Sequence, residues 1–222
     1  MPEINIFVQS TSPHVIIAEV FAAADEVNDW AKIQNRFPSR DMAPLSRHRQ
    51  LEHLAVDHAM IAFGAPWSNA QIEHDARGKP QLMENEKFIS ISHHSMERSC
   101  WVIICIGDQS VGCDIERPRA QLHAIAKRFL SPAEQNNFNT TPLLCCAWGV
   151  KESMFKTIGH DVDFRVDLTV DDIQFTSAES LEATGMMKGQ SSKWKIWKVK
   201  SGDQQDKNEI ELYAVAGPSN DL

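Results

Sequence analysis

Val111-Gly112-Cys113-Asp114-Ile115-Glu116 is the stretch of this chain from which both a strand and a candidate site can be inferred. Side chains alternate between the two faces of a strand, so Asp114 and Glu116 are predicted to point one way and the apolar residues the other. Two carboxylates about 4 Å apart repel by about 4 kcal/mol at an effective dielectric of about 20. A hard divalent cation such as Mg²⁺ removes that repulsion. The stretch alone favours a solvated acidic strand face over a metal site.

A second stretch, Trp148-Gly149-Val150-Lys151-Glu152-Ser153-Met154-Phe155-Lys156, has the spacing of a helix. Glu152 and Lys156 are four residues apart and share one helix face, with Trp148 one turn earlier. A Glu–Lys pair at this spacing is also a common surface ion pair, worth a few tenths of a kcal/mol. Read alone, this stretch favours the surface pair.

Possible anion-binding groups occur upstream. His93 follows the run Ile89-Ser90-Ile91-Ser92, a predicted strand that leads into a polar turn, and it could donate to a phosphate or be a capping or exposed histidine. Arg47 and Arg49 open a predicted helix, and Lys79 lies in a Gly-Lys-Pro turn. Basic side chains at such places are usually only solvated.

The hydrophobic pattern predicts an α+β fold without an internal repeat. Helices are expected at 46–63, 121–129 and about 142–158, with a further start at Ser131-Pro132-x-Glu134, where Ser is the N-cap and Pro the first residue. Strands are expected at 4–9, 88–92, 101–106, 111–116, 172–176, 193–199 and 210–216. The three strands between 88 and 116 are expected to pair antiparallel. Residues 21–37 are ambiguous, and 201–208 read as a mobile polar loop.

Composition limits the classes of function. The chain has 222 residues, 42% hydrophobic and 23% charged, which is ordinary for a globular protein. Its net charge of −8 argues against binding nucleic acid or an anionic membrane. Five cysteines without a C-x-x-C pair indicate a reducing compartment. Because no secretory signal is visible and the longest apolar run, 100–106, cannot span a bilayer, we expect a cytoplasmic protein.

Together, the order and spacing of these motifs resemble the Sfp-type 4′-phosphopantetheinyl transferases. The pattern is Ser-Ile-Ser-His at 90–93, Gly-x-Asp-x-Glu at 112–116 and Trp-x-x-Lys-Glu-Ser-x-x-Lys at 148–156. The Gly78-Lys79-Pro80 turn and the segment Phe129–Glu134 fit the same family. The resemblance covers roughly residues 46–160, and its specific part is the last two motifs.

The resemblance implies a site, residue by residue. Asp114, Glu116 and Glu152 would bind Mg²⁺, which holds the pyrophosphate of coenzyme A. Lys156 would contact the transferred phosphate and Lys151 would lie near the phosphates. His93, with Ser92 beside it, would touch a coenzyme A phosphate, and Lys79 would lie near the 3′-phosphate. The candidate nucleotide contacts also include Arg47 and Arg49.

The activity implied is transfer of 4′-phosphopantetheine from coenzyme A to a serine of an apo carrier protein, with release of 3′,5′-ADP. Glu152 is the first candidate for the base that accepts the serine proton and Glu116 the second, and the sequence does not decide between them. Carrier proteins of this kind present an acidic helix, and the segment with Arg117, Arg119, Lys127 and Arg128 would meet it. An ordinary amphipathic helix explains that segment equally well.

The family fold is two similar α+β halves related by a pseudo-twofold axis, each a small, mostly antiparallel sheet packed on helices. This architecture is implied by the resemblance alone. We expect an N-terminal half at 1–108 with the nucleotide contacts and a C-terminal half at 109–222 with the metal site and carrier docking. A monomer fits this arrangement.

Three positions depart from the family pattern: His94 and Gly149, where Ser or Thr is usual, and Asp57, where the family often has an arginine for the nucleotide phosphates. Asp57 motivates an alternative, an impaired relative that binds coenzyme A or a carrier protein without transfer. An unrelated Mg²⁺-dependent phosphohydrolase is a third hypothesis, for which the sequence contains no water-activating motif.

Overall fold

The computed structural model of the chain describes residues 2–11, 14–83, 85–201 and 210–218. It divides into two compact units, Met1–Gln109 and Ser110–Leu222. Each unit combines one antiparallel sheet with helices, so the predicted α+β class with two similar halves is confirmed. The pseudo-twofold relation stays a prediction.

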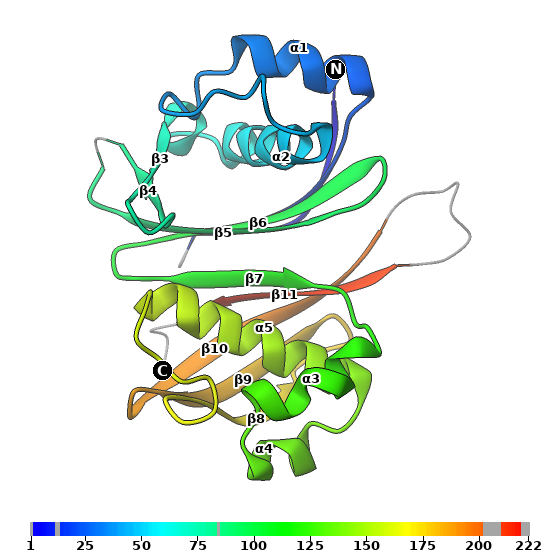
Figure 1. Ribbon diagram of the computed structural model, residues 1–222, viewed down its shortest axis with the longest axis vertical. Helices are drawn as coiled ribbons and strands as arrows, with labels where there is room; N and C mark the ends of the chain where they lie inside the picture. The colour runs from blue at the N-terminus through cyan, green and yellow to red at the C-terminus, as the bar shows by residue number, and fades with distance from the viewer. Residues whose placement is uncertain (1, 12–13, 84, 202–209, 219–222) are drawn as a thin grey trace. The chain divides into compact units, whose positions relative to one another are not determined.

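The first unit is built on a six-stranded sheet with strand order β1-β2-β6-β5-β4-β3. In Figure 1, its helices lie on one face of this sheet. The elements are β1 (Glu3–Thr11), β2 (His14–Phe21), α1 (Ala24–Ile33), α2 (Arg47–Phe63), a 3₁₀ turn (Trp67–Asn69), β3 (Ile72–His74), β4 (Pro80–Leu82), β5 (Phe88–Ser95) and β6 (Ser99–Gly107).

Helix α2 is the centre of this unit's core. It begins after Ser46, whose hydroxyl accepts the amide N–H of Arg49 (3.4 Å), and it ends at Gly64, whose φ of 78° suits glycine. The apolar side of the helix packs on alternate residues of the sheet. The buried contacts include Leu51, Leu54, Ala55 and Ala59 of α2 with Ile16, Ala18, Val102 and Ile104 of the sheet.

The second unit is a five-stranded sheet with order β7-β11-β10-β9-β8, and every neighbouring pair is antiparallel. Its elements are β7 (Gly112–Glu116), α3 (Gln121–Phe129), α4 (Pro132–Asn137), α5 (Thr141–Ile158), β8 (Leu168–Phe175), β9 (Ser180–Met187), β10 (Gln190–Lys200) and β11 (Glu211–Gly217). Helix α5 supplies most of the helical side of the core, including Leu144, Ala147, Val150 and Met154.

Helix α5 and the sheet come very close together at Gly112, the first residue of β7. A Cβ atom added there would overlap the carbonyl oxygen of Ser153 and lie 2.6 Å from the hydroxyl of Thr157. Only glycine allows the strand this close to the helix backbone. Because β7 runs directly beneath α5, the polar side chains that follow Gly112 on the same face meet the C-terminal half of the helix.

The structure corrects several sequence expectations. Strands β2 and β9 were missed, because β2 is a nearly continuous apolar run and β9 contains a glycine and little alternation. The ambiguous 21–37 segment contains α1. The sequence predicted that β7 pairs with β5 and β6. In the structure it pairs instead with β11, in the sheet of the second unit. Most of the loop expected at 201–208 lies outside the described residues.

Among the helices that the structure describes, none has the length and apolar character needed to cross a membrane.

Gly112→Ala tests the close approach of β7 to α5. We expect it to lower the free energy of unfolding of the second unit by about 3 kcal/mol, because helix and strand must separate to admit a methyl group. Urea unfolding followed by circular dichroism measures the change. Gly189→Ala is the matched control: its φ of 80° makes alanine unfavourable by about 1 kcal/mol, but nothing lies within 4 Å of the added atom. Equal losses for the two variants would contradict the steric explanation.

Candidate functional site

Asp114 and Lys156 form the centre of a charged cluster in the second unit. The Lys156 ammonium donates to Oδ1 of Asp114 (2.8 Å) and to the carbonyl oxygen of Cys113 (3.0 Å). The Asp114 side chain is only 7% exposed, whereas that of Lys156 is 29% exposed. Burial alone would lower the pKa of Lys156, but the neighbouring Asp114 charge outweighs it and the pKa is raised. Lys156 is therefore held as a cation that still reaches solvent.

Glu116 lies two residues further along β7, on the same face as Asp114. Its Oε1 accepts the indole N–H of Trp148 (3.1 Å), and Arg119 approaches its other oxygen at 3.8 Å. Trp148 is itself held by aromatic neighbours, with ring centroids 4.9 Å from Phe129 and 6.0 Å from Phe164. Burial, followed by the Asp114 charge, raises the pKa of Glu116.

Glu152 completes the cluster from α5, one turn before Lys156. Its pKa is raised to about 7, chiefly by burial and then by the negative charge of Asp114, with a smaller contribution from Glu116. No hydrogen bond from any of the described residues reaches its carboxylate. The cluster therefore brings together the three predicted carboxylates, and Glu152 is the one whose lone pairs are not committed.

The chemistry of this cluster fits a divalent cation. All three candidate ligands are carboxylates, the hard oxygen donors that Mg²⁺ prefers. When all are ionised, their three negative charges exceed the one positive charge of Lys156 by two. Burial is the main cause of the raised pKa values of Glu116 and Glu152, and the charge of Asp114 adds to it. Within the described ranges, however, no three His, Cys, Asp or Glu side chains already lie in a metal-binding arrangement. The cluster supplies suitable ligands rather than a finished coordination sphere.

Lys151 does not belong to this cluster, although the family resemblance implied a place near the phosphates. Its side chain is fully buried, and its ammonium donates to the carbonyl oxygens of Phe129 (2.8 Å) and Phe164 (2.7 Å) and to the Glu134 carboxylate (2.7 Å). These partners use all three of its N–H donors. Burial lowers its pKa, while Glu134 opposes the shift. Lys151 is thus a structural residue that links α5 to α4 and to the loop after α5.

Glu134 extends this buried network. It also accepts the amide N–H of Ser131 (2.7 Å), completing the capping box of α4, and the amide N–H of Val170 in β8 (2.8 Å). The expected N-cap and acidic residue at 131–134 are present. Their additional role in anchoring Lys151 could not be read from local spacing.

The first unit contains a separate polar cluster around Glu52 of α2. The side chain of Glu52 is 8% exposed and contacts Nδ1 of His93 (3.4 Å) and the guanidinium of Arg49 (2.8 Å). Strand β5 continues through Ser95, so His93 lies in a strand rather than in the expected turn. Two of the expected nucleotide contacts, Arg49 and His93, therefore share one carboxylate.

Three further expected contacts, Arg47, Ser92 and Lys79, also belong to this unit. Arg47 is exposed at the first residue of α2, and Ser92 is half-buried on β5. Lys79 follows Gly78, whose φ of 83° forms a turn closed by Oδ1 of Asp75, which accepts the amide N–H of Lys79 (2.9 Å). Burial lowers the pKa of Lys79.

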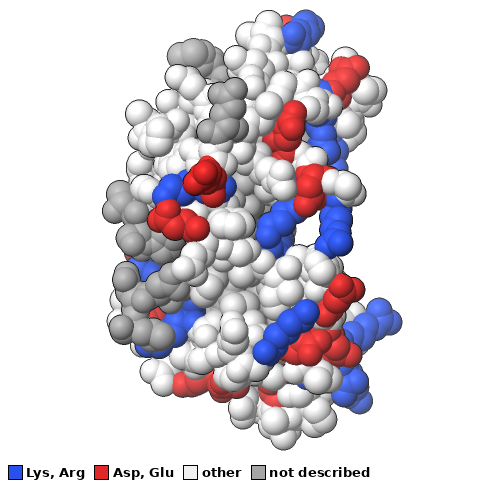
Figure 2. Space-filling view, turned by 90° about the vertical axis from the view of Figure 1, so that its left-hand side faces the viewer, with Lys and Arg blue, Asp and Glu red and all other residues white. Residues whose placement is uncertain are grey.

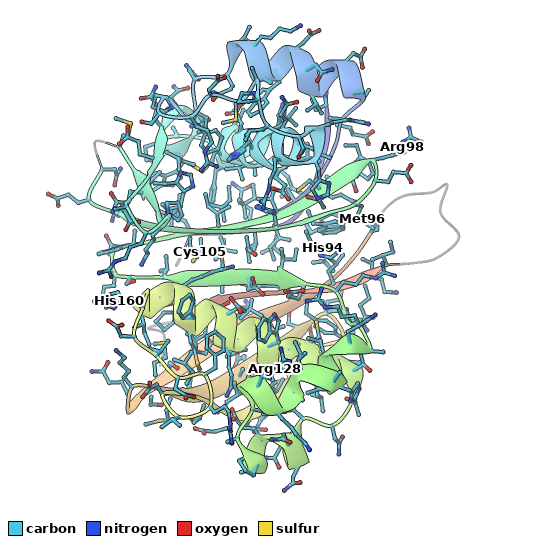
Figure 3. The ribbon with its side chains drawn as sticks, viewed as in Figure 1. His94, Met96, Arg98, Cys105, Arg128 and His160 are labelled. Carbon is cyan, nitrogen blue, oxygen red and sulfur yellow. The ribbon has the colours of Figure 1, made fainter. Side chains whose placement is uncertain are left out.

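The structure shows what surrounds each of the three residues that depart from the family pattern. Asp57 accepts the Nε–H of Arg36 (2.9 Å) and the indole N–H of Trp30 (2.7 Å), so it ties α1 and the following loop to α2. His94 alternates with His93 and extends from the face of the sheet opposite α2 (Figure 3). A Cβ atom at Gly149 would lie 3.0 Å from Val215 and 3.7 Å from Asp114, so little space is present there.

Basic residues line the outer side of α3 and the segment before it. Leu122 and Phe129 are buried, whereas Lys127 and Arg128 are exposed. Arg128 is labelled on α3 in Figure 3. Arg117 and Arg119 are also exposed. On the face shown in Figure 2, acidic and basic side chains are interspersed. Any positively charged area on this face is therefore confined to a small group of residues.

Two contributors to these clusters were missed from the sequence. Trp148 was noted only for its place on the helix face, one turn before Glu152, which was the available signal for a contact with the acidic strand. Glu52 was not considered at all. Glu52 lies three residues after Arg49 and four after His48, a spacing that places their side chains side by side on a helix. This spacing was only a weak signal of a polar cluster, because such pairs are common on exposed helices.

Comparison with known proteins relates the second unit to one superfamily. Residues 110–216 match the model of the 4′-phosphopantetheinyl transferase superfamily. The chain is 27% identical over 119 residues to a 4′-phosphopantetheinyl transferase of Bacillus subtilis, a match that covers 50% of this chain and 47% of the relative. It is 28% identical over 115 residues to the 4′-phosphopantetheinyl transferase psf-1 of Bacillus pumilus, which covers 49% and 47%.

The matched segment contains the whole cluster of Asp114, Glu116, Trp148, Glu152 and Lys156. The resemblance inferred from the sequence is confirmed: residues 110–216 match the 4′-phosphopantetheinyl transferase superfamily, and both relatives are named as 4′-phosphopantetheinyl transferases. The matches span about half the length of these curated relatives.

Lys151→Met and Lys156→Met should affect stability by very different amounts. Lys151→Met leaves the Glu134 carboxylate buried without its cation and should lower the free energy of unfolding by about 3–5 kcal/mol. Lys156 is partly exposed, so Lys156→Met should change stability by about 1 kcal/mol or less. Urea unfolding of both variants gives the comparison, with exposed Lys127→Met as control. A Lys151→Met protein as stable as the wild type would contradict the structural role of Lys151.

Proposed function

We propose that this protein transfers the 4′-phosphopantetheine group of coenzyme A to a serine of an apo carrier protein, with Mg²⁺ as the metal. The observation that carries the proposal is the convergence of Asp114, Glu116, Glu152 and Lys156 from β7 and α5, within the segment that matches the superfamily. The two relatives bear the name of this activity.

Asp114, Glu116 and Glu152 would hold the metal, and a bound Mg²⁺ would neutralise the charge of the coenzyme A diphosphate. Lys156 would add a positive charge at the transferred phosphate, since its ammonium is fixed by Asp114 yet reaches solvent. In the first unit, Arg49 and His93, together with Arg47, Lys79 and Ser92, would contact the remaining phosphates and the nucleotide. We do not include Lys151, because its N–H donors are already used.

The reaction forms one bond and breaks another. The serine oxygen attacks the β-phosphorus of coenzyme A, the bond from that phosphorus to the bridging oxygen breaks, and 3′,5′-ADP leaves with the bonding electrons. Protein groups contribute mainly by positioning and by balancing the developing negative charge. Lys156 is the residue of this chain that would stabilise the charge on the phosphoryl oxygens.

The serine proton needs an acceptor, and Glu152 is the stronger candidate. Among the three carboxylates, Asp114 is paired with Lys156, and Glu116 accepts the indole N–H of Trp148. Glu152 accepts no hydrogen bond within the described part of the chain, so its oxygens remain open to a donor. Glu116 is the alternative acceptor.

The exposed basic residues Arg117, Arg119, Lys127 and Arg128 would steer the acidic helix of a carrier protein toward this unit. We expect the protein to act in the cytoplasm as a monomer, and its five free, buried cysteines are compatible with a reducing compartment. An impaired relative that binds coenzyme A without transfer is the second candidate. The Asp57 contacts with Arg36 and Trp30 weaken its motivation, since they give this residue a structural task.

The direct test mixes the protein with apo acyl carrier and apo peptidyl carrier proteins, coenzyme A and Mg²⁺. We expect the carrier to gain the mass of one phosphopantetheine, measured by mass spectrometry. Asp114→Ala should slow transfer by about 100-fold or more, because it removes a proposed metal ligand and the partner of Lys156. Asp171→Ala, which removes an exposed carboxylate on β8, is the matched control and should retain the wild-type rate.

Coenzyme A binding without mass gain on either carrier would support the impaired relative. Normal turnover of a folded Asp114→Ala protein would remove Asp114 from the proposed site.

Trp148→Phe tests whether the indole N–H positions Glu116. Phenylalanine keeps an aromatic ring beside Phe129 and Phe164 but cannot donate to the carboxylate. We expect the Mg²⁺ concentration for half-maximal transfer to rise about tenfold, as for other partners that orient a metal ligand. Trp194→Phe is the control, since it also removes a buried indole donor, which bonds to Ser192 at 2.9 Å. An unchanged Mg²⁺ requirement in Trp148→Phe would show that this hydrogen bond does not matter.

A further inference from the structure

Lys156 binds the oxygen of Asp114 through which a cation from solvent would reach this carboxylate. Its ammonium donates to Oδ1 of Asp114 at 2.8 Å and to the carbonyl oxygen of Cys113 at 3.0 Å. The other oxygen of Asp114, Oδ2, is buried, and a Cβ atom added at Gly149 of α5 would lie 3.7 Å from it. The position at Oδ1 is therefore already taken by a positive charge.

The same ammonium acts on the two other carboxylates of the cluster. Burial raises the pKa values of Glu116 and Glu152, and the positive charge of Lys156 opposes this shift at both. One lysine thus offsets part of the negative charge of three carboxylates, which a divalent cation would do more completely. In the part of the chain that the structure describes, these carboxylates are not yet arranged around a metal position. The arrangement that the structure shows is the one held by the ammonium.

An ammonium and a divalent cation on one carboxylate oxygen repel each other. At equal distance, the repulsion between a divalent and a monovalent cation is twice that between two monovalent cations. Lysine can relieve this repulsion, because its charge lies at the end of a flexible aliphatic stem and the side chain of Lys156 is 29% exposed. A phosphate oxygen, which is itself anionic, offers the released ammonium a new acceptor.

We propose that Lys156 holds the place of the metal in the free protein and releases Asp114 when Mg²⁺ and coenzyme A bind. Its ammonium then moves from Oδ1 to a phosphate oxygen of coenzyme A. The inference rests on the proposed function, which gives Lys156 a phosphate to contact, and it adds that Lys156 positions Asp114 beforehand. Mg²⁺ alone therefore competes with Lys156, whereas coenzyme A accepts the ammonium and so tightens metal binding. By linkage, the metal tightens the binding of coenzyme A by the same factor.

Titration calorimetry with Mg²⁺, in the absence of coenzyme A, measures this competition. Lys156→Met should bind Mg²⁺ about tenfold more tightly than the wild type, because no ammonium has to be displaced and a neighbouring charge changes proton binding to a carboxylate by a similar factor. The same variant should transfer phosphopantetheine more slowly, since it lacks the charge at the phosphate. A general loss of structure would weaken both properties, so tighter metal binding with slower transfer identifies the displacement.

Arg119→Met separates displacement from a general effect of charge. Arg119 lies 3.8 Å from Glu116 and its side chain is 49% exposed, so the substitution also removes a positive charge beside the cluster. Its ion pair is with Glu116 rather than with Asp114, and the affinity for Mg²⁺ should rise about threefold or less. Equal gains in the two variants, or no gain in Lys156→Met, would overturn the proposal.

Crystal structures of the wild type, one free of metal and one grown with Mg²⁺ and coenzyme A, provide a readout that needs no variant. In the first, Nζ of Lys156 should lie within hydrogen-bond distance of Oδ1 of Asp114. In the second, Oδ1 should bind the metal and Nζ should contact a phosphate oxygen. A Lys156 that keeps its hydrogen bond to Oδ1 beside the bound metal would overturn the proposal.

Transfer assays on the wild type distinguish a failure of this inference from a failure of the proposed function. If the wild type binds Mg²⁺ and coenzyme A and transfers the arm, but Lys156 keeps its bond to Asp114, only the displacement fails. If the wild type neither binds the metal nor transfers the arm, the proposed function fails as well.

Discussion

The contact of Gly112 with the backbone of α5 is the constraint on which the candidate site depends. A strand can lie directly beneath a helix only where a side chain is missing, and the glycine meets this condition at Ser153. Asp114 and Glu116 follow at intervals of two along β7, while Glu152 and Lys156 are separated by one helical turn. The side chains of the strand and those of the helix therefore meet only because Gly112 fixes how β7 lies against α5.

The same contact gathers an excess of negative charge in the cluster. Three carboxylates gather with one ammonium, and burial adds to their mutual repulsion in raising the pKa values of Glu116 and Glu152. Lys156 is hydrogen-bonded to Asp114 and also offsets part of the negative charge of Glu116 and Glu152, but burial and the charge of Asp114 outweigh it at both. The remaining negative charge is a physical reason for a cation to bind here, and it stands independently of the family resemblance.

The local patterns in the sequence predicted helices better than strands. The helix at 121–129 and the N-cap at Ser131 follow from spacing and cap residues, which act over a few neighbours. Which strands pair does not follow from such signals: β7 was grouped with β5 and β6, but its partner, β11, lies almost a hundred residues away. The carboxylate cluster was predicted because a family pattern linked its parts. The contacts of Glu52 and Trp148 were not, since each joins segments that no local pattern connects.

Lys151 and Glu152 show why a motif does not assign a role to each of its residues. They are adjacent in the sequence, but successive residues of an α-helix point about 100° apart. On α5, that rotation turns Glu152 toward β7 and the charge of Asp114, whereas Lys151 enters the interior and meets Glu134 and two carbonyl oxygens. A fully buried ammonium is tolerated only when every donor is used, so its role is structural. The two charged residues of one motif thus serve different purposes: Lys151 holds the helix in place, and that placement brings Glu152 to the acidic strand.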